Sequence, residues 1–331
     1  MTTVMEMEAK EAPVRIATQL FENKPLIADI VEKIRAFNPK YVMTVGRGTS
    51  DHAGVFAKYL IEVELGLPVS SAAPSVSGVY GKQMDLSSGL VLFISQSGRS
   101  PDILGQVEMA KKGGAFCIAL VNDETSPIKD LVDAVIPLKA GPENAVAATK
   151  SYLATLSAII QLVATWANNL ELITALDNLP KQMQQAVDAA PQIPAAALQT
   201  VKNCVVLGRG FGYAVSLEIA LKLKEVCAIH AEAFSSAEFL HGPVTLAEQE
   251  LKILDISVMD ESYQVHRAQV EGVRARGASF IHMTQTSDNI HPRLAPLTIL
   301  QRFYLDVEKV ALARGVNPDA PPGLKKVTKT L

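Results

Sequence analysis

The chain has 331 residues, of which 48% are apolar and 5% aromatic, and its formal net charge is −3. This length predicts two domains with well-packed α/β cores. The weak charge and the scarcity of aromatic rings argue against a nucleic-acid partner, which a basic and aromatic surface would attract. The three cysteines are scattered through apolar runs, which indicates buried thiols in a reducing compartment and neither disulfides nor a metal site.

The N-terminus lacks a basic segment followed by an apolar one, so we expect no signal peptide and a cytoplasmic location. The most apolar stretch, residues 152–167, is shorter than the roughly 20 residues that span a bilayer. It also contains Thr155, Ser157, Gln161 and Thr165. We therefore predict a buried helix there and no membrane partner.

Predicted elements follow one another along the first half of the chain. Residues 1–24 are expected to form an extended arm leading into a short helix that Pro13 interrupts. The pattern then predicts a helix at Leu26–Phe37, a strand at Tyr41–Val45, a helix from Asp51, a strand at Leu90–Ile94, a helix at Ile103–Lys111 and strands at Phe116–Val121 and Ala134–Pro137. This alternation predicts βαβ units and a mostly parallel sheet.

The same pattern returns in the second half. VGRG at residues 45–48 has a counterpart in LGRG at residues 207–210, roughly 160 residues later, and each follows a strand-like run and precedes a helix. Further strands are predicted at residues 251–257 and 279–283. We infer two copies of one α/β domain. The stretch 168–197, rich in Gln, Ala and Pro, is the predicted connector.

Two loops that follow predicted strands are rich in hydroxyl groups. Ser95–Ser100 lies between a strand and a helix N-terminus, where unpaired N–H groups and the helix dipole favour an anion. Thr49 and Ser50 occupy the corresponding place after the first strand, and loops at the carboxyl ends of adjacent strands converge. Helix capping would account for one hydroxyl per loop. The larger number favours a bound phosphate.

Neither loop matches a common nucleotide-binding motif. A Walker loop is excluded because no GK[ST] follows, and Asp51 stands where a dinucleotide fingerprint requires its third glycine. We therefore expect no nicotinamide cofactor. No HExxH or clustered His/Cys pattern predicts a metal.

Residues 207–245 contain a predicted helix with three charges on one face. Glu218, Lys222 and Glu225 stand at i, i+4 and i+7, whereas the remaining faces carry apolar residues that must be buried: Val215, Ile219, Leu223, Val226 and Ile229. One interpretation is a solvated face with a weak ion pair. The other is a catalytic lysine and carboxylate in a cleft, with His241 nearby as a second proton carrier.

Four motifs in this order (GRGTS, SQSGRS, ALKLKE and EFLHGP) resemble the sugar isomerase (SIS) domain family. The doubled arrangement is similar to the isomerase half of glucosamine-6-phosphate synthase and to stand-alone SIS-type glucosamine-6-phosphate deaminases. The resemblance implies two tandem SIS domains, each a mostly parallel sheet flanked by helices in a flavodoxin-like, three-layer αβα fold. It gives an arm at 1–24, domains at 25–170 and 197–316, a connector at 171–196 and a tail at 317–331.

The resemblance also implies roles for individual residues. The sugar phosphate would be bound by Thr49, Ser50, Ser95, Gln96, Ser97 and Ser100. Glu225 would move a proton between C1 and C2, beside Lys222 near the C2 substituent. His241 would open the sugar ring, reaching over from the neighbouring subunit of a homodimer. Lys326, or Lys325 if the tail shifts by one, would close the site.

One further segment implied to line the sugar contains Val146 and Ala148. The family synthase has serine where Ala148 stands, so one contact to a sugar hydroxyl differs here. The synthase also carries a glutaminase whose cysteine follows the initiator methionine, whereas Thr2 follows Met1 in this chain.

We therefore expect a metal-independent glucosamine-6-phosphate deaminase that needs no cofactor. The alternatives are a fructosamine 6-phosphate deglycase, a galactosamine 6-phosphate deaminase/isomerase, or a non-catalytic sugar-phosphate sensor.

Overall fold

The computed structural model describes residues 2–324 and 326, and its chain forms two compact units. Unit 1 contains Met1–Pro13, Asn144–Thr149 and Asn178–Lys326. Unit 2 contains Val14–Glu143 and Lys150–Asp177. The division is discontinuous because the first helix contributes residues to both units and the loop Asn144–Thr149 belongs to unit 1 although its neighbours in the chain belong to unit 2. The predicted domain boundaries stay predictions.

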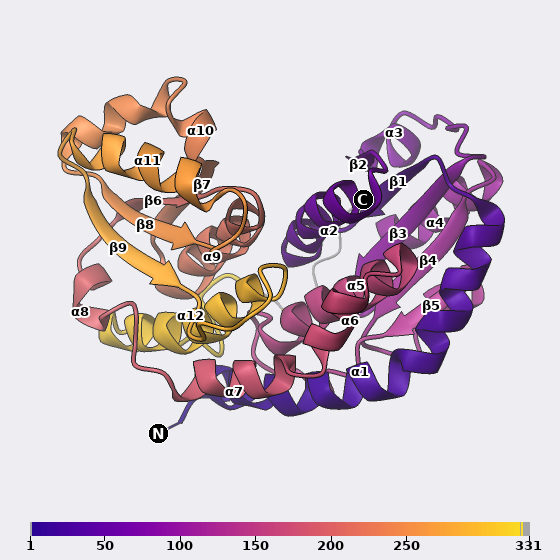
Figure 1. Ribbon diagram of the computed structural model, residues 1–331, viewed down its shortest axis with the longest axis horizontal. Helices are drawn as coiled ribbons and strands as arrows, with labels where there is room; N and C mark the ends of the chain where they lie inside the picture. Colours follow the sequence, from indigo (N-terminus) through magenta and orange to yellow (C-terminus); the bar gives the residue numbers. More distant parts are fainter. Residues whose placement is uncertain (1, 325, 327–331) are drawn as a thin grey trace. The chain divides into compact units, whose positions relative to one another are not determined.

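Unit 2 is built on a five-stranded parallel sheet in the order β2-β1-β3-β4-β5 (Figure 1). Its strands are β1 (Tyr41–Val45), β2 (Val69–Ser71), β3 (Gly89–Ser95), β4 (Phe116–Val121) and β5 (Ala134–Pro137). Such an order places the point where the winding reverses between β1 and β3, and ligands of open α/β sheets bind there. The predicted strands at residues 41–45, 116–121 and 134–137 are confirmed with the same bounds.

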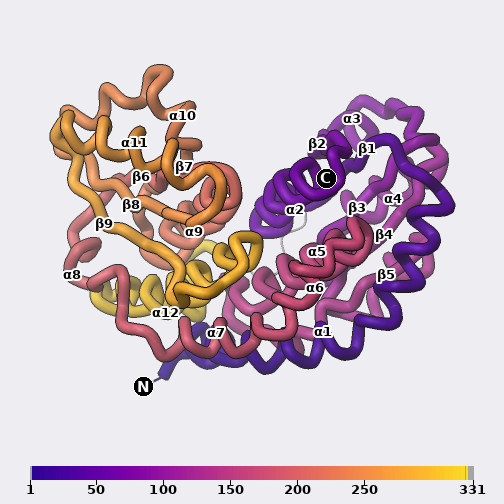
Figure 2. The backbone as a smooth tube through the Cα atoms, in the orientation of Figure 1, coloured from indigo at the N-terminus to yellow at the C-terminus, as the bar shows by residue number. Residues whose placement is uncertain are grey.

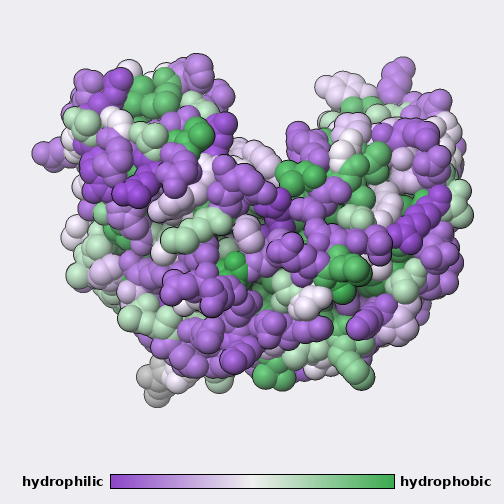
Figure 3. Space-filling model, viewed as in Figure 1, coloured by the Kyte–Doolittle hydropathy of each residue, from purple (hydrophilic) through white to green (hydrophobic). Residues whose placement is uncertain are grey.

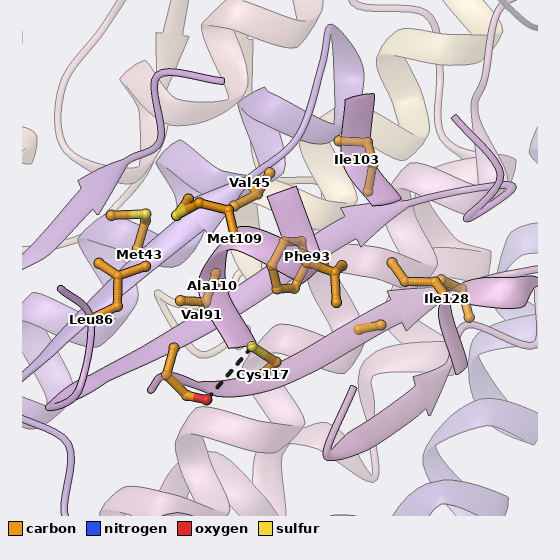
Figure 4. Packing of buried hydrophobic residues seen from close by; sticks show 14 residues of the cluster. Met43, Val45, Leu86, Val91, Phe93, Ile103, Met109, Ala110, Cys117 and Ile128 are labelled. Atoms are coloured by element: carbon orange, nitrogen blue, oxygen red, sulfur yellow. Dashed lines mark hydrogen bonds between the residues drawn. The ribbon is translucent and has the colours of Figure 1, made fainter. Parts of the chain in front are cut away.

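Helices flank this sheet and close its core. They are α2 (Thr49–Leu65), α3 (Ser75–Gly78), α4 (Pro101–Lys112), the short η1 (Pro127–Asp130), α5 (Lys150–Ala167) and α6 (Leu170–Leu176). Figure 4 shows the packing of Val91 and Phe93 from β3 with Cys117 from β4 and Met109 from α4. Burial raises the pKa of the Cys117 thiol to about 12, which agrees with the prediction of buried cysteines.

Unit 1 contains a four-stranded parallel sheet in the order β7-β6-β8-β9. Its strands are β6 (Asn203–Gly208), β7 (His230–Ser235), β8 (Lys252–Ser257) and β9 (Ser279–Thr284). Its helices are α7 (Leu179–Asp188), α8 (Ala195–Leu198), α9 (Phe211–Cys227), α10 (Ser236–Phe239), η2 (Pro243–Gln249), α11 (Tyr263–Arg274) and α12 (Ala295–Ala313). The predicted fold class, two parallel-sheet α/β regions flanked by helices, is confirmed.

The predicted N-terminal arm is wrong, because α1 is one helix from Val4 to Phe37 (Figure 2). Pro13 cannot donate to the Ala9 carbonyl, which would normally break the helix. The side chain of Gln301 on α12 supplies the missing donor, with its Nε2 2.9 Å from the Ala9 oxygen. The predicted connector likewise contains two helices, α6 and α7.

The apolar stretch at residues 152–167 forms most of α5, and α5 is buried from Lys150 to Ala164. Among the described helices, none combines the length and the apolar character needed to cross a membrane. Hydrophilic side chains dominate the face shown in Figure 3, and the hydrophobic ones form small separate areas.

Candidate functional site

The hydroxyl-rich loops of unit 2 lie at one edge of its sheet. β1 and β3 are parallel neighbours, with Val45 paired to Phe93, so their carboxyl ends are adjacent. Thr49 and Ser50 begin α2 after β1, and Ser95 ends β3. The structure therefore brings the six predicted phosphate ligands to the switch point of this sheet: Thr49, Ser50, Ser95, Gln96, Ser97 and Ser100.

A tight turn fixes the loop after β3. Gly98 has φ 58°, and a Cβ at this position would collide with Ser126 Oγ. The Ser126 hydroxyl donates to the Gly98 carbonyl at 2.6 Å, and the Gly98 N–H donates to Ser95 Oγ at 3.0 Å. The loop is thus held from both sides with its glycine in the left-handed region.

Helix capping does not account for the hydroxyl groups of these loops. The N-cap residue of α2 is Gly48, so neither Thr49 nor Ser50 is the cap. Ser100 is the N-cap of α4, yet among the described residues its side chain makes no capping hydrogen bond. The Ser100 hydroxyl therefore does not cap α4. An anion-binding role needs a hydroxyl that is not taken up by capping.

The one arginine of the loop after β3 is held away from the turn. Arg99 Nε lies 2.9 Å from Asp123 Oδ2, and its Nη2 donates to Thr125. Hydrogen bonds from Thr125, together with the Arg99 guanidinium group, lower the pKa of Asp123 to about 2. Neutral donors are therefore left to hold an anion here.

A pocket of about 340 Å³ opens next to these loops, which the sequence did not predict. It is lined by Arg47 of the GRGTS motif and by residues of α3 and α4 that include Ser75, Ser77, Asp102 and Gln106. Arg47 Nε lies 3.1 Å from Asp102 Oδ2. The predicted serines do not line this pocket.

In unit 1, the charged face of α9 is buried. Glu218 is 0% exposed and Lys222 is 1% exposed, so the interpretation as a solvated face is wrong. The predicted apolar positions are all fully buried: Val215, Ile219, Leu223, Val226 and Ile229. Helix α9 ends at Cys227, where Ala228 takes a left-handed conformation with φ 50°. Only Glu225, at 23% side-chain exposure, remains open to a ligand.

Lys222 connects the two carboxylates of this helix. Its Nζ lies 3.2 Å from Glu218 Oε1 and 2.5 Å from Glu225 Oε2. Burial alone would lower the pKa of the Lys222 ammonium group, but the charges and hydrogen bonds of Glu218 and Glu225 outweigh it and raise the pKa above 10.5. A permanent positive charge therefore stands beside the half-open carboxylate.

The segment with Val146 and Ala148 is held by both ends of the chain. The Glu8 carboxylate on α1 accepts the N–H groups of Asn144 at 2.5 Å and Ala145 at 3.2 Å. Lys326 Nζ donates to the Ala145 carbonyl at 2.6 Å, which brings a tail lysine to this segment. The alternative tail residue, Lys325, lies outside the described residues.

His241 lies on an exposed turn between α10 and η2. Its N–H donates to the Glu238 carbonyl at 3.0 Å, which fixes the backbone of the turn. The predicted sharing of this side chain with a second subunit stays a prediction.

Two buried polar groups of unit 1 were not anticipated from the sequence. Tyr304 on α12 donates to Glu218, 86 positions away, and no local pattern announces such a pair. His266 lies between Asp255 (Nε2 to Oδ1, 2.6 Å) and Ser236 (Nδ1 to Oγ, 2.9 Å). Across residues 2–324 and 326, no group of three His, Cys, Asp or Glu side chains is arranged to hold a metal ion.

The predicted site residues thus divide between the two units. The phosphate ligands belong to unit 2, whereas Lys222, Glu225, His241, Lys326 and the segment with Val146 and Ala148 belong to unit 1. Their assembly into one site stays a prediction.

Comparison with known proteins gives this arrangement a context. The chain is 32% identical over 345 residues to the isomerizing glutamine–fructose-6-phosphate aminotransferase of Methanothermobacter thermautotrophicus, a match that covers 97% of this chain and 56% of that protein. The chain therefore spans about half the length of the curated relatives it matches.

Solved structures match over almost the whole chain. A Silicibacter pomeroyi protein, described provisionally as a phosphosugar isomerase, has a TM-score of 0.89 and 36% identity, covering 96% of this chain and 100% of that one. The glucosamine-6-phosphate deaminase of Thermotoga maritima has a TM-score of 0.71 and 21% identity, covering 96% and 100%, and shows the shared fold alone.

The SIS domain model matches residues 37–165 and 197–303, which include β1 to α5 of unit 2 and most of unit 1 from β6 to α12. These two matches contain both GRG turns, the serine loop and the helix with Lys222 and Glu225. The chain belongs to the SIS domain family.

Proposed function

We propose that this chain is a glucosamine-6-phosphate deaminase of the isomerising type, which converts glucosamine 6-phosphate and water to fructose 6-phosphate and ammonia. The observation that carries the proposal is the buried Lys222, held between two carboxylates of which only Glu225 is open. Burial of a charged lysine carries a desolvation cost, and buried charged groups of this kind concentrate at functional sites. The name of the aminotransferase relative supports a hexose 6-phosphate substrate.

In this proposal the phosphate group of the substrate binds the loops after β1 and β3. Ser95, Ser97 and Ser100 offer hydroxyl donors, and the N-termini of α2 and α4 offer backbone N–H groups. The fixed turn at Gly98 means that these donors need little rearrangement to receive an anion. The phosphate would anchor one end of an open-chain sugar.

The proton transfer is assigned to Glu225. It removes the C2 proton of the open-chain aldehyde and returns a proton at C1. Over the same sequence O1 takes up a proton and the C2 amine gives one up, so that the amine becomes an imine. Water hydrolyses the imine, giving the ketone of fructose 6-phosphate and ammonia. The ammonium groups of Lys222 or Lys326 stabilise the negative charge that develops on O1.

Ring opening needs a proton carrier between the ring oxygen and the C1 hydroxyl. An imidazole has a suitable pKa range, and His241 is exposed on its turn. We propose that His241 serves a partner subunit, so that the active form is a homodimer.

The test is ammonia release from glucosamine 6-phosphate, galactosamine 6-phosphate and fructosamine 6-phosphate, without glutamine. We expect release and fructose 6-phosphate formation from the first substrate. Release from one of the others instead would assign the related activity, and binding of all three without turnover would favour a sensor.

A Glu225→Gln variant is expected to lose turnover by at least about 10³-fold, because the amide cannot take the C2 proton. Glu232→Gln on the exposed side of β7 serves as the matched control and should retain full activity. Full activity of Glu225→Gln would end the assignment of the base.

A further inference from the structure

A tyrosine from α12 reaches the charged cluster on α9. Tyr304 is 0% exposed, and its hydroxyl donates to Glu218 Oε1 at 3.3 Å. The same oxygen lies 3.2 Å from Lys222 Nζ. One carboxylate oxygen is thus shared by a phenol and an ammonium group, all within a buried environment.

Lys222 is not placed symmetrically between its two carboxylates. Its Nζ lies 2.5 Å from Glu225 but 3.2 Å from Glu218. A fully buried carboxylate should attract the ammonium group at least as strongly as a partly exposed one, because solvent screens the latter. The Tyr304 hydroxyl donates to the same Glu218 oxygen that Lys222 approaches, so it competes with the ammonium group for that oxygen.

We propose that Tyr304 is a positioning residue that holds the Lys222 ammonium group toward Glu225. The inference rests on the proposed function, in which Glu225 is the base. By donating to Glu218, the phenol occupies one of the hydrogen-bond-accepting positions of that carboxylate. Lys222 then lies nearer to Glu225, the proposed base, and its positive charge is closer to the negative charge that develops on O1.

Other ionisable groups near this helix are accounted for. On α9 itself these are Tyr213, Glu218, Lys222, Lys224, Glu225 and Cys227. On α12 they are Arg302, Tyr304, Asp306, Glu308 and Lys309, of which Arg302 pairs with Asp306 and Lys309 with Glu308. The strands packed on α9 carry Cys204 on β6, His230 and Glu232 on β7, and Lys252 and Asp255 on β8. The carboxylate of Asp255 is engaged by His266 and His282, and His230 and Glu232 are exposed.

The test is Tyr304→Phe, which removes one oxygen and leaves the ring in place. Glu218 then draws Lys222 away from Glu225. We expect kcat to fall roughly 10-fold with KM unchanged, because a buried acceptor loses a donor. We also expect the acid limb of the kcat pH profile to move upward by about half a pH unit, because the Lys222 charge then lies farther from the carboxylate proposed as the base.

The matched control is Ser216→Ala. Ser216 is also 0% exposed and lies on α9, but its hydroxyl donates to the Gly212 carbonyl at 2.8 Å. Loss of this hydroxyl should leave the pH profile in place. A purely structural role of Tyr304 would lower the activity and thermal stability of Tyr304→Phe without moving the acid limb.

A second variant covers the case in which Tyr304→Phe folds poorly. Incorporation of 3-fluorotyrosine at position 304 gives a stronger donor, and the acid limb should then move to lower pH. Unshifted limbs in both Tyr304 variants, with a normal wild-type profile, would overturn this inference alone. A wild-type chain that releases no ammonia from any of the three substrates would overturn both this inference and the proposed function.

Discussion

Strands β3 and β8 occupy the same place in their two sheets but carry different chemistry. In unit 2, Phe93 of β3 pairs with Val45 of β1, and in unit 1, Asp255 of β8 pairs with Leu207 of β6. Phe93 is 0% exposed in an apolar cluster, whereas Asp255 is 3% exposed and is hydrogen-bonded to two histidines. The two strands therefore share the same pairing with their neighbours but differ in the side chain that is buried at this position.

Asp255 belongs to a small polar network in unit 1. Asp255 accepts from His266 at 2.6 Å and from His282 at 2.7 Å. Burial alone would raise the pKa of Asp255, but the two histidines outweigh it and lower the pKa. A carboxylate that replaces an aromatic ring thus survives in the core because it is paired.

The loops after these strands differ in the same way. The loop after β3 reads SQSGRS and offers hydroxyl donors, whereas the loop after β8 reads SVMDES and places Asp260 and Glu261 at the corresponding positions. Asp260 accepts from Ser262, and Glu261 forms two 2.7 Å contacts with Arg293. Carboxylates at this edge repel an anion. One copy of the repeat thus leaves hydroxyl donors at this edge, where we propose that the phosphate binds, and the other copy uses the same edge for internal pairing.

The largest effect is expected from breaking the Asp255 network. His266→Ala should lower the free energy of unfolding by about 3 kcal/mol, because it leaves a buried carboxylate without its main partner. Urea denaturation measures this. The double variant Asp255→Leu, His266→Leu should recover most of the loss, since apolar replacement of a buried pair is often neutral. A loss below about 1 kcal/mol in the single variant would contradict a structural role for this pair.

The next test puts the chemistry of one loop into the other. Ser97→Asp should raise KM for glucosamine 6-phosphate by about 100-fold or more, because a carboxylate then faces the phosphate. Met259→Asp adds a charge at the corresponding exposed position after β8 and should leave KM unchanged. Equal effects of the two substitutions, measured by initial rates, would remove the distinction between the loops.

A smaller effect is expected from the turn that shapes the phosphate loop. Gly98→Ala should cost about 1 to 3 kcal/mol, because its φ is positive and its Cβ would collide with Ser126. Gly105→Ala, in α4, meets nothing within 4 Å and should stabilise the protein by up to about 1 kcal/mol. Thermal unfolding of both variants checks this, and a neutral Gly98→Ala would show that the loop is not held as described.

The smallest effect concerns the acidic loop after β8. Hydrogen bonds from Arg293 lower the pKa of Glu261 from 4.5 to about 2, so the contribution of this pair is present above pH 4.5 and is lost as the pH falls to about 2. Glu261 is 74% exposed, so Glu261→Gln should cost less than about 1 kcal/mol at pH 7. The free energies of unfolding of the wild-type chain and of Glu261→Gln should differ at pH 7 and become equal near pH 2. A difference that persists at pH 2 would point to another role.

Much of the fold could be predicted because its strands are short apolar runs between turn residues. Tyr41–Val45 and Phe116–Val121 match their predicted bounds for this reason. Strand β7, HAEAFS, was missed, since its polar residues do not form an apolar run. The helix through Pro13 was also missed, because its missing donor comes from Gln301, far along the chain.

The candidate site was predicted less completely. Motif order identified the serine loop and the face of α9, and burial then decided that this face is not solvated. The i, i+4 spacing of Glu218 and Lys222 is the same on exposed and on buried helix faces, so the sequence alone could not show whether this pair is buried. Partners such as Tyr304 and Glu8 act across long sequence separations, which no local pattern reveals.

The central claim is that Glu225 transfers a proton between C1 and C2 of an amino-sugar phosphate. Glucosamine 6-phosphate incubated with the chain in D₂O, and followed by NMR, tests it most directly. The account predicts deuterium at C1 of the fructose 6-phosphate product with the wild-type chain and no incorporation with Glu225→Gln. Equal incorporation or equal ammonia release by the two proteins would contradict it, whereas a wild-type product without deuterium at C1 would mean that Glu225 returns the substrate's own C2 proton before it exchanges with solvent.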